Sequence, residues 1–419
     1  MNRPKMSRQG LSPESVRAIA FYLPQFHPVP ENDEWWGKGF TEWTNVAKAK
    51  PLFPGHYQPH LPADLGFYDL RLPEVREAQA DLAREYGIHG FCYYHYWFNG
   101  RRILERPFNE VLASGKPDFP FCLCWANENW TRIWDGGEKN VLLEQKYSHE
   151  DDLAHIESLM PAFRDGRYIR IDGKPLFLVY RTELMPDPAR TANIWREAAK
   201  QAGVGDLYLV RVENFSNDDP RSIGFDAAVE FAPDHSNVGR LKFRGRFHRL
   251  LARVGLVPRS YVENSVANYQ AMAEGTLKRP APDFTRFHCV TPSWDNSARR
   301  KQGAWLYVGS TPAKYGAWLK AAIRKTLGQR KGDERIVFIN AWNEWAEGNH
   351  LEPDLRWGGA YLEETRNALS SAEGPGVQIP VAASENVLPR PSLLKRLYWR
   401  ASNFAAEQKE LLKNIFAKD

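Results

Sequence analysis

The sequence of 419 residues is poor in several features that mark particular classes of protein. It holds only four cysteines, Cys92, Cys122, Cys124 and Cys289, and each lies inside an apolar run without other Cys or His at metal-ligand spacing. This pattern favours buried free thiols in a reducing compartment over disulfides or a zinc site. No run of about 18 apolar residues occurs, so we expect no membrane span.

Charge of one sign is also scarce. The formal net charge is +5, and the sequence has neither zinc-finger spacing nor an arginine-rich arm, so we expect no nucleic-acid partner. Residues 1–15 are polar and basic and lack the apolar segment of a secretory signal. We therefore expect a cytoplasmic protein.

Nucleotide-binding motifs are missing as well. No G-x-G-x-x-G or Walker A run follows the first apolar segment, which argues against a nucleotide-binding sheet. The pairs Asp151-Asp152 and Asp218-Asp219 are adjacent and lack the Asp-x-Asp spacing of many metal-dependent sugar transferases. We expect no cofactor and no metal requirement.

Aromatic residues, in contrast, are abundant, with 15 Trp, 17 Tyr and 22 Phe. Their rings stack on the flat C–H faces of sugars, so the composition is compatible with an oligosaccharide or polysaccharide substrate. A bulky core explains the same composition, and composition alone favours that explanation.

Eight short apolar runs recur along the chain, separated by longer segments such as Leu72–Tyr86, Ala189–Ala202 and Ala313–Leu327, which we predict as helices. Continuous apolar strands alternating with helices indicate a buried parallel sheet. Eight such units favour an α/β fold of the closed (β/α)8 TIM-barrel type over an open doubly wound sheet. The predicted strands are Ala18–Leu23, Gly87–Tyr94, Phe119–Trp125, Pro175–Tyr180, Leu207–Val212, Ala227–Phe231, Phe287–Pro292 and Arg335–Ala341.

We divide the chain into a disordered N-terminus (1–16), a catalytic barrel (17–372), a linker (373–391) and an amphipathic C-terminal helix (392–419). The mixed region Asp234–Pro282 is predicted to be a loop or subdomain inserted over the barrel mouth. The C-terminal helix is flanked by Arg and Lys, which allows peripheral contact with an anionic membrane at its inner face. Docking on the barrel or in a dimer is the simpler explanation, and the sequence leaves the oligomeric state open.

In a TIM barrel the active site is built at the carboxyl ends of the strands. After the eighth predicted strand, Glu344 and Glu347 stand three residues apart and can face one cavity if the segment turns helically. Glycosidic cleavage needs two carboxyl groups, one to protonate the leaving oxygen and one to act across the reacting carbon. Glu352 and Asp354 follow closely and could support the pair. Acidic residues at a helix start are the alternative explanation.

Polar and aromatic side chains after the other strands are predicted to bind the sugar. Asn, Glu and Arg beside Trp provide hydrogen bonds to hydroxyl groups next to a stacking platform, and His27 has the further option of acting as a base. The predicted substrate-binding residues are Tyr22, Gln25, His27, Trp36, Glu42, Trp43, Tyr94, His95, Tyr96, Trp97, Trp125, Asn127, Glu128, Trp130, Arg211, Glu213, Trp294, Trp342, Asn343 and Trp345.

The run Asn343-Glu344-Trp345-Ala346-Glu347-Gly348, with Leu351-Glu352-Pro353 downstream, resembles the catalytic segment of glycoside hydrolase family 99. That family comprises endo-α-mannosidases on a (β/α)8 barrel. Other runs resemble the WbsX family, a family-99-like group found with bacterial surface-polysaccharide biosynthesis and often labelled glycosyltransferase. The resemblance covers roughly Arg17 to Leu369, and the runs that carry it are Phe21–His27, Trp35–Gly37, Phe40–Trp43, Tyr93–Phe98 and Trp125–Trp130.

The resemblance implies roles for the two glutamates. Glu344 matches the base that removes the proton of the sugar 2-hydroxyl, whose oxygen then forms a 1,2-anhydro sugar. Glu347 matches the acid, and later the base, for the leaving group and the incoming water. Ala346 stands where the mannosidases have His. This departure allows a substrate other than mannan or N-glycan.

The sequence therefore predicts a retaining glycoside hydrolase or transglycosylase acting on an O-antigen, a capsular polysaccharide or a precursor of one. A glycosyltransferase of surface-polysaccharide biosynthesis is the main alternative. A non-catalytic glycan-binding barrel is a third, although a mere binder has no use for an acid–base pair.

Overall fold

The computed structural model describes residues 15–132, 137–214, 218–235, 241, 246–300 and 302–370. The predicted linker (373–391) and C-terminal helix (392–419) lie outside the described residues, as does the predicted N-terminal disorder except for its last two positions. Among the described residues, we find no helix with both the length and the apolar character that a bilayer crossing requires.

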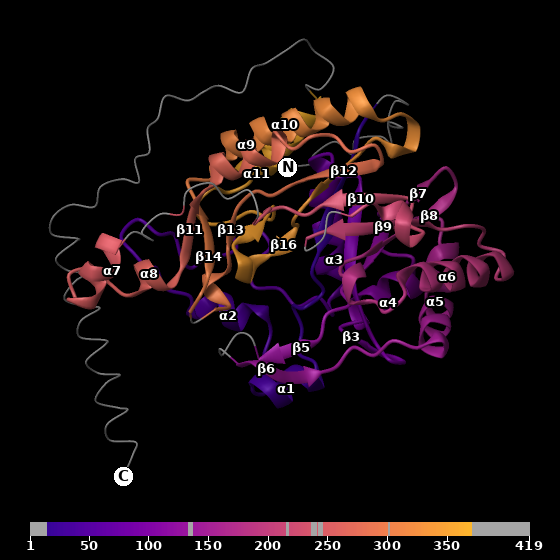
Figure 1. Ribbon diagram of the computed structural model, residues 1–419, viewed down its shortest axis with the longest axis horizontal. Helices are drawn as coiled ribbons and strands as arrows, with labels where there is room; N and C mark the ends of the chain where they lie inside the picture. Colours follow the sequence, from indigo (N-terminus) through magenta and orange to yellow (C-terminus); the bar gives the residue numbers. More distant parts are fainter. Residues whose placement is uncertain are drawn as a thin grey trace.

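Eight parallel strands form a closed barrel at the centre of the fold (Figure 1). Each strand pairs with the next one in chain order, and the last pairs back with the first, so the ring leaves no open edge. The TIM-barrel prediction is confirmed. The barrel strands are β1 (Arg17–Tyr22), β2 (Gly90–Phe98), β4 (Phe121–Trp125), β8 (Lys174–Val179), β9 (Tyr208–Glu213), β10 (Ala227–Glu230), β12 (Thr285–Val290) and β15 (Ile336–Ile339).

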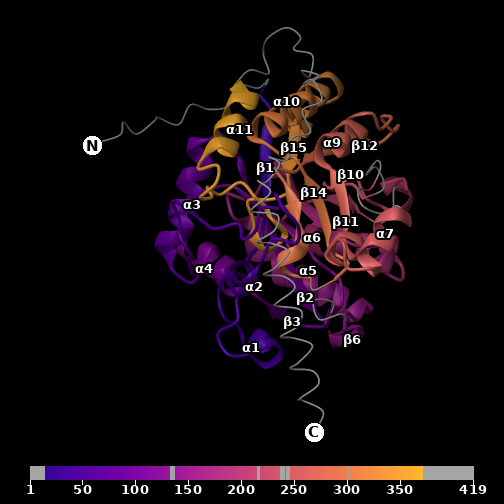
Figure 2. The ribbon, with the colours of Figure 1, turned by 90° about the vertical axis from the view of Figure 1, so that its left-hand side faces the viewer.

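Helices surround the barrel, and Figures 1 and 2 show α10 and α11 side by side along one flank. Local sequence sets where these helices begin: the side chain of Thr311 caps α10 by accepting from the Lys314 amide, and Pro312 occupies its first turn. The surrounding helices are α3 (Pro73–Glu85), α4 (Arg106–Ser114), α5 (His149–Arg164), α6 (Pro188–Gln201), α9 (Tyr269–Leu277), α10 (Pro312–Gln329) and α11 (Ala360–Ser370). The three predicted helices correspond to α3, α6 and α10.

Smaller elements lie in the connections between the barrel strands and the surrounding helices. One three-stranded sheet runs in the order β11-β14-β13, and β16 and β17 form a two-residue hairpin after the eighth barrel strand. The smaller elements are α1 (Pro30–Trp36), α2 (Glu42–Lys48), α7 (Arg246–Arg253), α8 (Ser260–Glu263), β3 (Arg101–Ile103), β5 (Trp130–Arg132), β6 (Gly137–Leu143), β7 (Arg170–Ile171), β11 (Ser265–Asn268), β13 (Trp294–Asp295), β14 (Trp305–Val308), β16 (Asn343–Glu344) and β17 (Asn349–His350). Single 3-10 turns are η2 (Thr182–Leu184), η3 (Pro220–Ile223), η4 (Asn296–Ala298), η5 (Gly332–Glu334) and η6 (Trp345–Glu347).

The inserted region is shorter than the predicted Asp234–Pro282. Helix α9 within it contacts α10 and takes the place of a barrel helix between β10 and β12. Only the part up to β11, with α7 and α8, is therefore an addition to the barrel.

Alternation along the strands sorts side chains between the barrel lumen and the outer layer. In the lumen Phe21 contacts Phe231, which directly follows β10, and Phe338 of the neighbouring β15, with ring centroids 5.9 and 5.6 Å apart. Phe177 has the opposite orientation and packs on Trp195 of α6 at 5.4 Å. The four cysteines are buried and unpaired, as predicted.

Candidate active site

The two glutamates of the eighth-strand loop lie on one side of a short helical turn. Glu344 ends β16 and Glu347 ends η6, and a 3-10 turn brings residues three apart onto the same side. Gly348 ends the turn in the left-handed conformation with φ of 55°. The helical turn expected between the glutamates is present, and it directs both carboxylates toward one space.

One arginine, Arg299, binds three carboxylates in this space. Its Nε lies 3.1 Å from Glu42 Oε2, Nη2 lies 3.0 Å from Glu344 Oε2, and Nη1 lies 2.8 Å from Glu347 Oε1. The side chain of Glu42 is fully buried, whereas that of Glu347 is 19% exposed. Glu347 is therefore the member of the cluster that is most accessible to a ligand.

Arg299 is not among the residues predicted from the sequence. The residue follows η4 in the loop after the seventh barrel strand, four positions beyond Asp295. Nothing in the run Ser297-Ala298-Arg299-Arg300 separates it from a surface arginine. The available signal was its place in a loop at the carboxyl end of the barrel, where a buried cation is a reasonable partner for acidic residues.

Burial and crowding make this cluster electrostatically unusual. Burial raises the pKa of Glu344 to about 8, the attraction of Arg299 opposes this, and the charges of Glu347 and Glu42 add to it. Burial also raises the pKa of Glu42, and the attraction of Arg299 again opposes this rise. For Arg299, burial alone would lower the pKa, but the three carboxylates raise it well above its usual value. One cation faces three carboxyl groups, so the cluster tends to hold a proton near neutral pH.

Two tyrosines of β2 line the lumen beside the cluster. Burial raises the pKa of Tyr94 and of Tyr96 well above the usual value, and in both cases the charge of Glu344 is the next contribution. The ring of Trp130 lies 5.4 Å from Tyr96, edge to face, and also contacts Trp35 at 5.7 Å. Trp130 is only half-buried. These rings provide a partly accessible aromatic wall next to the glutamates.

Glu128 lies on the same side of the barrel. It forms an ion pair with Arg181 and keeps 43% of its side chain exposed. Burial of the carboxyl group raises its pKa, Arg181 opposes this, and Glu183 and Glu347 add to it. An exposed carboxylate that senses Glu347 is well placed to accept hydrogen bonds from sugar hydroxyls.

Two predicted sugar-binding asparagines are instead committed to the backbone. Asn343 accepts from the Leu23 amide at 2.7 Å and donates to the Leu23 carbonyl at 3.0 Å. Asn127 makes the same pair of bonds with Arg181, at 2.8 Å each. Each side chain imitates a strand partner and fixes the loop of a neighbouring strand. In this conformation their amide groups hold the site together and are not free for a sugar.

A buried carboxyl group, Glu352, contacts the segment that carries the two glutamates. Glu352 Oε2 accepts from Trp345 Nε1 at 2.6 Å and from the Tyr68 hydroxyl at 2.8 Å, and its Oε1 accepts from Gln79 Nε2 at 2.6 Å. Burial raises the pKa of Glu352 to about 7, and the donors oppose this rise. Trp345 also stacks on His350 at 3.7 Å and is fully buried. Its ring positions the segment and has no face open to a sugar.

Several predicted sugar-binding residues point away from the lumen. β2 extends to Phe98, four residues beyond the prediction, so alternation continues through the aromatic run. His95 lies 2.9 Å from His155 of α5, and Trp97 donates to Asp151 of the same helix at 2.9 Å. The ring of Trp125 lies 4.5 Å from His155. A role in sugar binding does not fit these three positions.

The same holds for four further residues of the prediction. Tyr22 donates to Gln79 of α3 at 2.7 Å, and Trp342 packs on Phe91 at 5.1 Å. Arg211 and Glu213 lie within β9 instead of after it and are 2% and 5% exposed. Arg211 donates to the Asp218 carbonyl at 2.8 Å, and Glu213 pairs with Arg279 at 2.9 Å. These four side chains belong to the layer between strands and helices.

The remaining predicted residues lie in the connections that follow β1 and β12. Trp43 is nearly buried, donates to the Tyr68 carbonyl at 2.8 Å and stands 5.6 Å from Trp345. Burial lowers the pKa of His27 to about 4, which makes it a weak base. Gln25 and Trp294 are buried, whereas Trp36 is half-buried and contacts Phe40.

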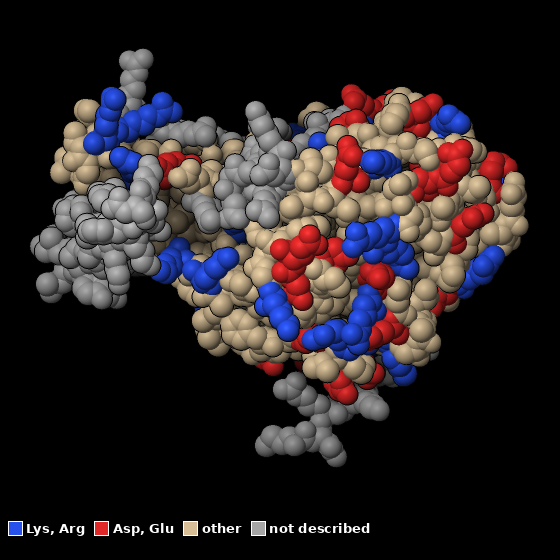
Figure 3. Space-filling model, turned by 90° about the horizontal axis from the view of Figure 1, so that it is seen from below, with Lys and Arg blue, Asp and Glu red and all other residues tan. Residues whose placement is uncertain are grey.

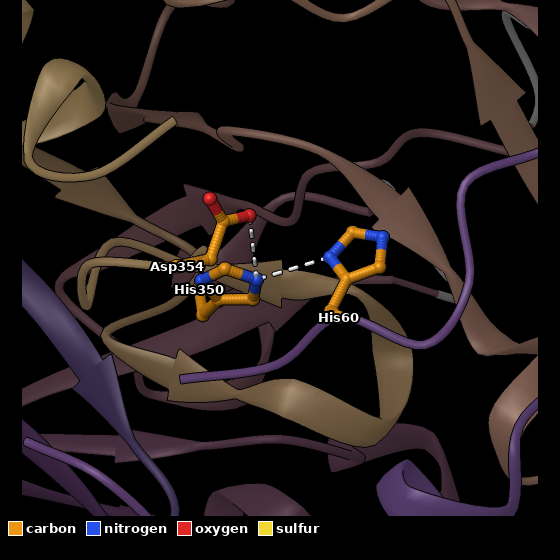
Figure 4. A group of neighbouring side chains, drawn as sticks. All are labelled: His60, His350 and Asp354. Carbon is orange, nitrogen blue, oxygen red and sulfur yellow. Dashed lines mark hydrogen bonds and ion pairs between the residues drawn. The ribbon is translucent and has the colours of Figure 1, made fainter. Parts of the chain in front are cut away.

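Two histidines and an aspartate, His60, His350 and Asp354, form a buried group (Figure 4). It is a grouping in the described part of the chain that could hold a metal ion. His350 Nδ1 donates to the Glu352 carbonyl at 3.0 Å, so its Nε2 is free to accept from His60 Nδ1 at 3.0 Å. Asp354 Oδ2 lies 3.9 Å from the same Nε2. One hydrogen bond accounts for the contact between the two histidines, whereas Asp354 lies beyond hydrogen-bonding distance of His350. We assign no metal to the group.

Gly348 offers a direct test of how tightly the turn is fitted. A Cβ at this position would stand 3.0 Å from Asp295 Cβ and 3.2 Å from its carbonyl oxygen. Asp295 caps η4, which leads to Arg299, so we expect Gly348→Ala to disturb the cluster and to lower activity. Gly358→Ala is the matched control, because its φ of 52° is similar and its surroundings are open. We expect the control to cost about 1–2 kcal/mol in unfolding free energy and to keep its activity. Equal losses in both variants would contradict the importance of the close contact.

Comparisons with known proteins identify the family of the chain. A family model described as glycosyltransferase WbsX matches residues 18–365. Two curated relatives, both described as uncharacterized protein WxcX and found in two strains of Xanthomonas campestris pv. campestris, are 47% identical over 369 residues. That alignment covers 88% of this chain and 52% of each relative, so the chain spans about half the length of the curated relatives it matches.

Solved structures share the fold at low sequence identity. A glycoside hydrolase-like protein is 15% identical with a TM-score of 0.52, over 88% of this chain and 97% of the other. A family-99 endo-α-mannosidase from Bacteroides thetaiotaomicron is 14% identical with a TM-score of 0.50, over 84% of this chain and 96% of the other. The resemblance noted in the sequence is confirmed. Because the family model matches most of the length of this chain, the chain belongs to the glycosyltransferase WbsX family.

Proposed function

We propose that this chain is a carbohydrate-active enzyme that cleaves a glycosidic bond in a bacterial surface polysaccharide or its precursor, with retention of anomeric configuration. The observation that carries the proposal is the pair Glu344 and Glu347, held by one guanidinium at the carboxyl end of a TIM barrel. Four buried unpaired thiols suit a reducing compartment, so we place the enzyme in the cytoplasm.

In the proposed reaction Glu344 removes the proton of the sugar 2-hydroxyl, and that oxygen attacks the anomeric carbon. Glu347 donates its proton to the leaving oxygen as the glycosidic bond breaks. Water then opens the 1,2-anhydro sugar, with Glu347 taking a proton from the water and Glu344 returning one to the 2-oxygen. The greater exposure of Glu347 fits a group that meets both the leaving group and water.

The raised pKa of Glu344 gives this scheme a pH signature. Only the ionised form of Glu344 accepts a proton, and its pKa of about 8 lies above the ordinary 4.5, so the active fraction grows as pH rises through about 8. We expect kcat/KM to rise over this interval, because the fraction of Glu344 that is ionised increases. A pH–rate profile of cleavage checks this, with thermal unfolding at each pH as the control. A rate that falls between about pH 6 and 8 contradicts Glu344 as the base.

Glycosyl transfer is the second candidate, because the family model is described as a glycosyltransferase. The two functions are separated by incubating purified protein with the producing organism's surface glycan and lipid-linked oligosaccharides, without any nucleotide sugar. Mass spectrometry then identifies the products. Cleavage that disappears in Glu347→Gln supports the hydrolase. No cleavage, but sugar addition once nucleotide sugars are supplied, supports the transferase and contradicts the proposed reaction.

A further inference from the structure

Exposed apolar side chains gather on and just after α7. Phe247 is 67% exposed, Leu250 57%, Val254 60% and Leu256 57%. Phe247, Leu250 and Val254 follow helical spacing and share one side of the helix, which continues to Val254 through its bond to the Leu250 carbonyl. Ala252, on the opposite side, is buried. The helix therefore rests on the protein by its Ala252 side and turns its apolar side outward.

Positive charge accompanies these side chains. Arg249, Arg253 and Arg259 are exposed in the same segment, and no acidic residue occurs between Ser236 and Val262. The cations of that stretch are Arg240, Lys242, Arg244, Arg246, Arg249, Arg253 and Arg259. In Figure 3 Lys and Arg gather at the left-hand end, where α7 lies in Figure 1, whereas both signs are interspersed over the rest of the face.

The segment is tied to the loops that build the active site. The Ser260 hydroxyl at the start of α8 donates to the Leu52 carbonyl at 2.8 Å. β11, which follows α8, pairs with β14, and β14 pairs with β13, from which the chain passes through η4 to Arg299. Whatever binds α7 is therefore held near the face of the barrel that carries the glutamate cluster.

We propose that this α7 surface (Phe247, Leu250, Val254 and Leu256 with Arg249, Arg253 and Arg259) docks the protein on an anionic phospholipid membrane. Apolar side chains enter the boundary between headgroups and acyl chains, while the long arginine side chains reach the phosphates. The three aliphatic side chains, Leu250, Val254 and Leu256, favour a membrane over an RNA or DNA partner, because a nucleic acid has no apolar phase for them to enter. The docking does not depend on the reaction proposed above, and it would bring the active site close to lipid-linked glycans.

The test is partition of the full chain onto vesicles of phosphatidylcholine with phosphatidylglycerol, compared with phosphatidylcholine alone, by co-sedimentation. We expect preference for the anionic vesicles and weaker binding at high salt. Phe247→Ser with Leu250→Ser should lower the partition coefficient at least about tenfold. Arg249→Gln and Arg253→Gln should each lower it about fivefold. Leu72→Ser with Leu184→Ser is the matched control, since these side chains are 52% and 41% exposed elsewhere, and it should bind like the wild type.

Absence of binding to anionic vesicles, or equal binding to both kinds, would overturn the proposal. So would a loss that follows Leu411→Ser with Leu412→Ser in the predicted C-terminal helix while the Phe247 and Leu250 variant binds normally. Unchanged binding by Glu347→Gln is expected and separates docking from catalysis. The Phe247 and Leu250 substitutions are at exposed positions, and an unchanged melting temperature verifies that the variant folds.

Discussion

Glu347→Gln is expected to lower kcat for glycan cleavage by about 10²–10⁴-fold, because glutamine retains the shape of the side chain and cannot donate the proton that the leaving oxygen needs. Glu344→Gln should lower kcat by the same factor or more, since the 2-hydroxyl then keeps its proton. The measurement is kcat at saturating glycan, with circular dichroism to verify the fold. Glu363→Gln on the exposed side of α11 is the matched control and should have wild-type activity.

The leaving group distinguishes the two roles. A synthetic glycoside with a strongly acidic phenol as leaving group needs little protonation, so it should restore much of the rate of Glu347→Gln. The same substrate should not rescue Glu344→Gln, because attack by the 2-oxygen still lacks a base. Near-native turnover of either variant on the natural glycan would show that the assignment of that residue is wrong, and rescue of Glu344→Gln alone would reverse the two roles.

Arg299→Met should be the most damaging single change to the fold of the site. It leaves Glu42 and Glu344 buried without the cation that pairs them, and removal of one partner from a buried ion pair typically costs about 3–5 kcal/mol. Urea unfolding measures this loss. Because Arg299 lowers the pKa of Glu344, its removal should also move the rising limb of the pH–rate profile to higher pH. Arg300→Met, at the next position, is the control for the loss of a positive charge in this loop.

Further substitutions at Arg299 separate charge from geometry. Arg299→Lys retains the charge but lacks the planar fork that meets three carboxylates at once, so we expect intermediate stability and low activity. Arg299→Met with Glu344→Gln should be more stable than Arg299→Met alone, because one unpaired carboxylate has been removed. If Arg299→Met unfolds at the wild-type urea concentration, the ion-pair cluster does not contribute to stability as argued here.

The sequence predicted the barrel because its signal is local and repeated. Each of the eight strands is a short run rich in apolar residues, and the paired order follows from βα units joined in chain order. The glutamate pair was also within reach, because the position of a residue at the carboxyl end of a barrel strand depends only on where the strand ends. The 3-10 turn aligns Glu344 with Glu347 because residues three apart lie on the same side of such a turn.

The direction of side chains near strand ends was less predictable. With a side-chain period of two, the count along the strand decides which face of the sheet a residue occupies, and the aromatic run Tyr93–Phe98 does not reveal where the strand stops. β2 continues through it, so Tyr94 and Tyr96 face the lumen while His95 and Trp97 face α5. An error of a few residues in where β2 ends therefore changes whether a side chain is predicted to bind sugar or to pack in the core.

Residue types and spacings along the sequence by themselves determined the fold and the placement of Glu344 and Glu347 after the eighth barrel strand, because both depend on local pattern. The tertiary structure alone decided which partners those carboxyl groups meet. Arg299 comes from another loop, and Glu42 lies about 300 residues earlier in the chain. The side chain of Asn343 is hydrogen-bonded to the backbone of Leu23, directly after the first strand. Long-range electrostatics and the desolvation of buried groups set the pKa of Glu344, and neither is encoded in the spacing of neighbouring residues.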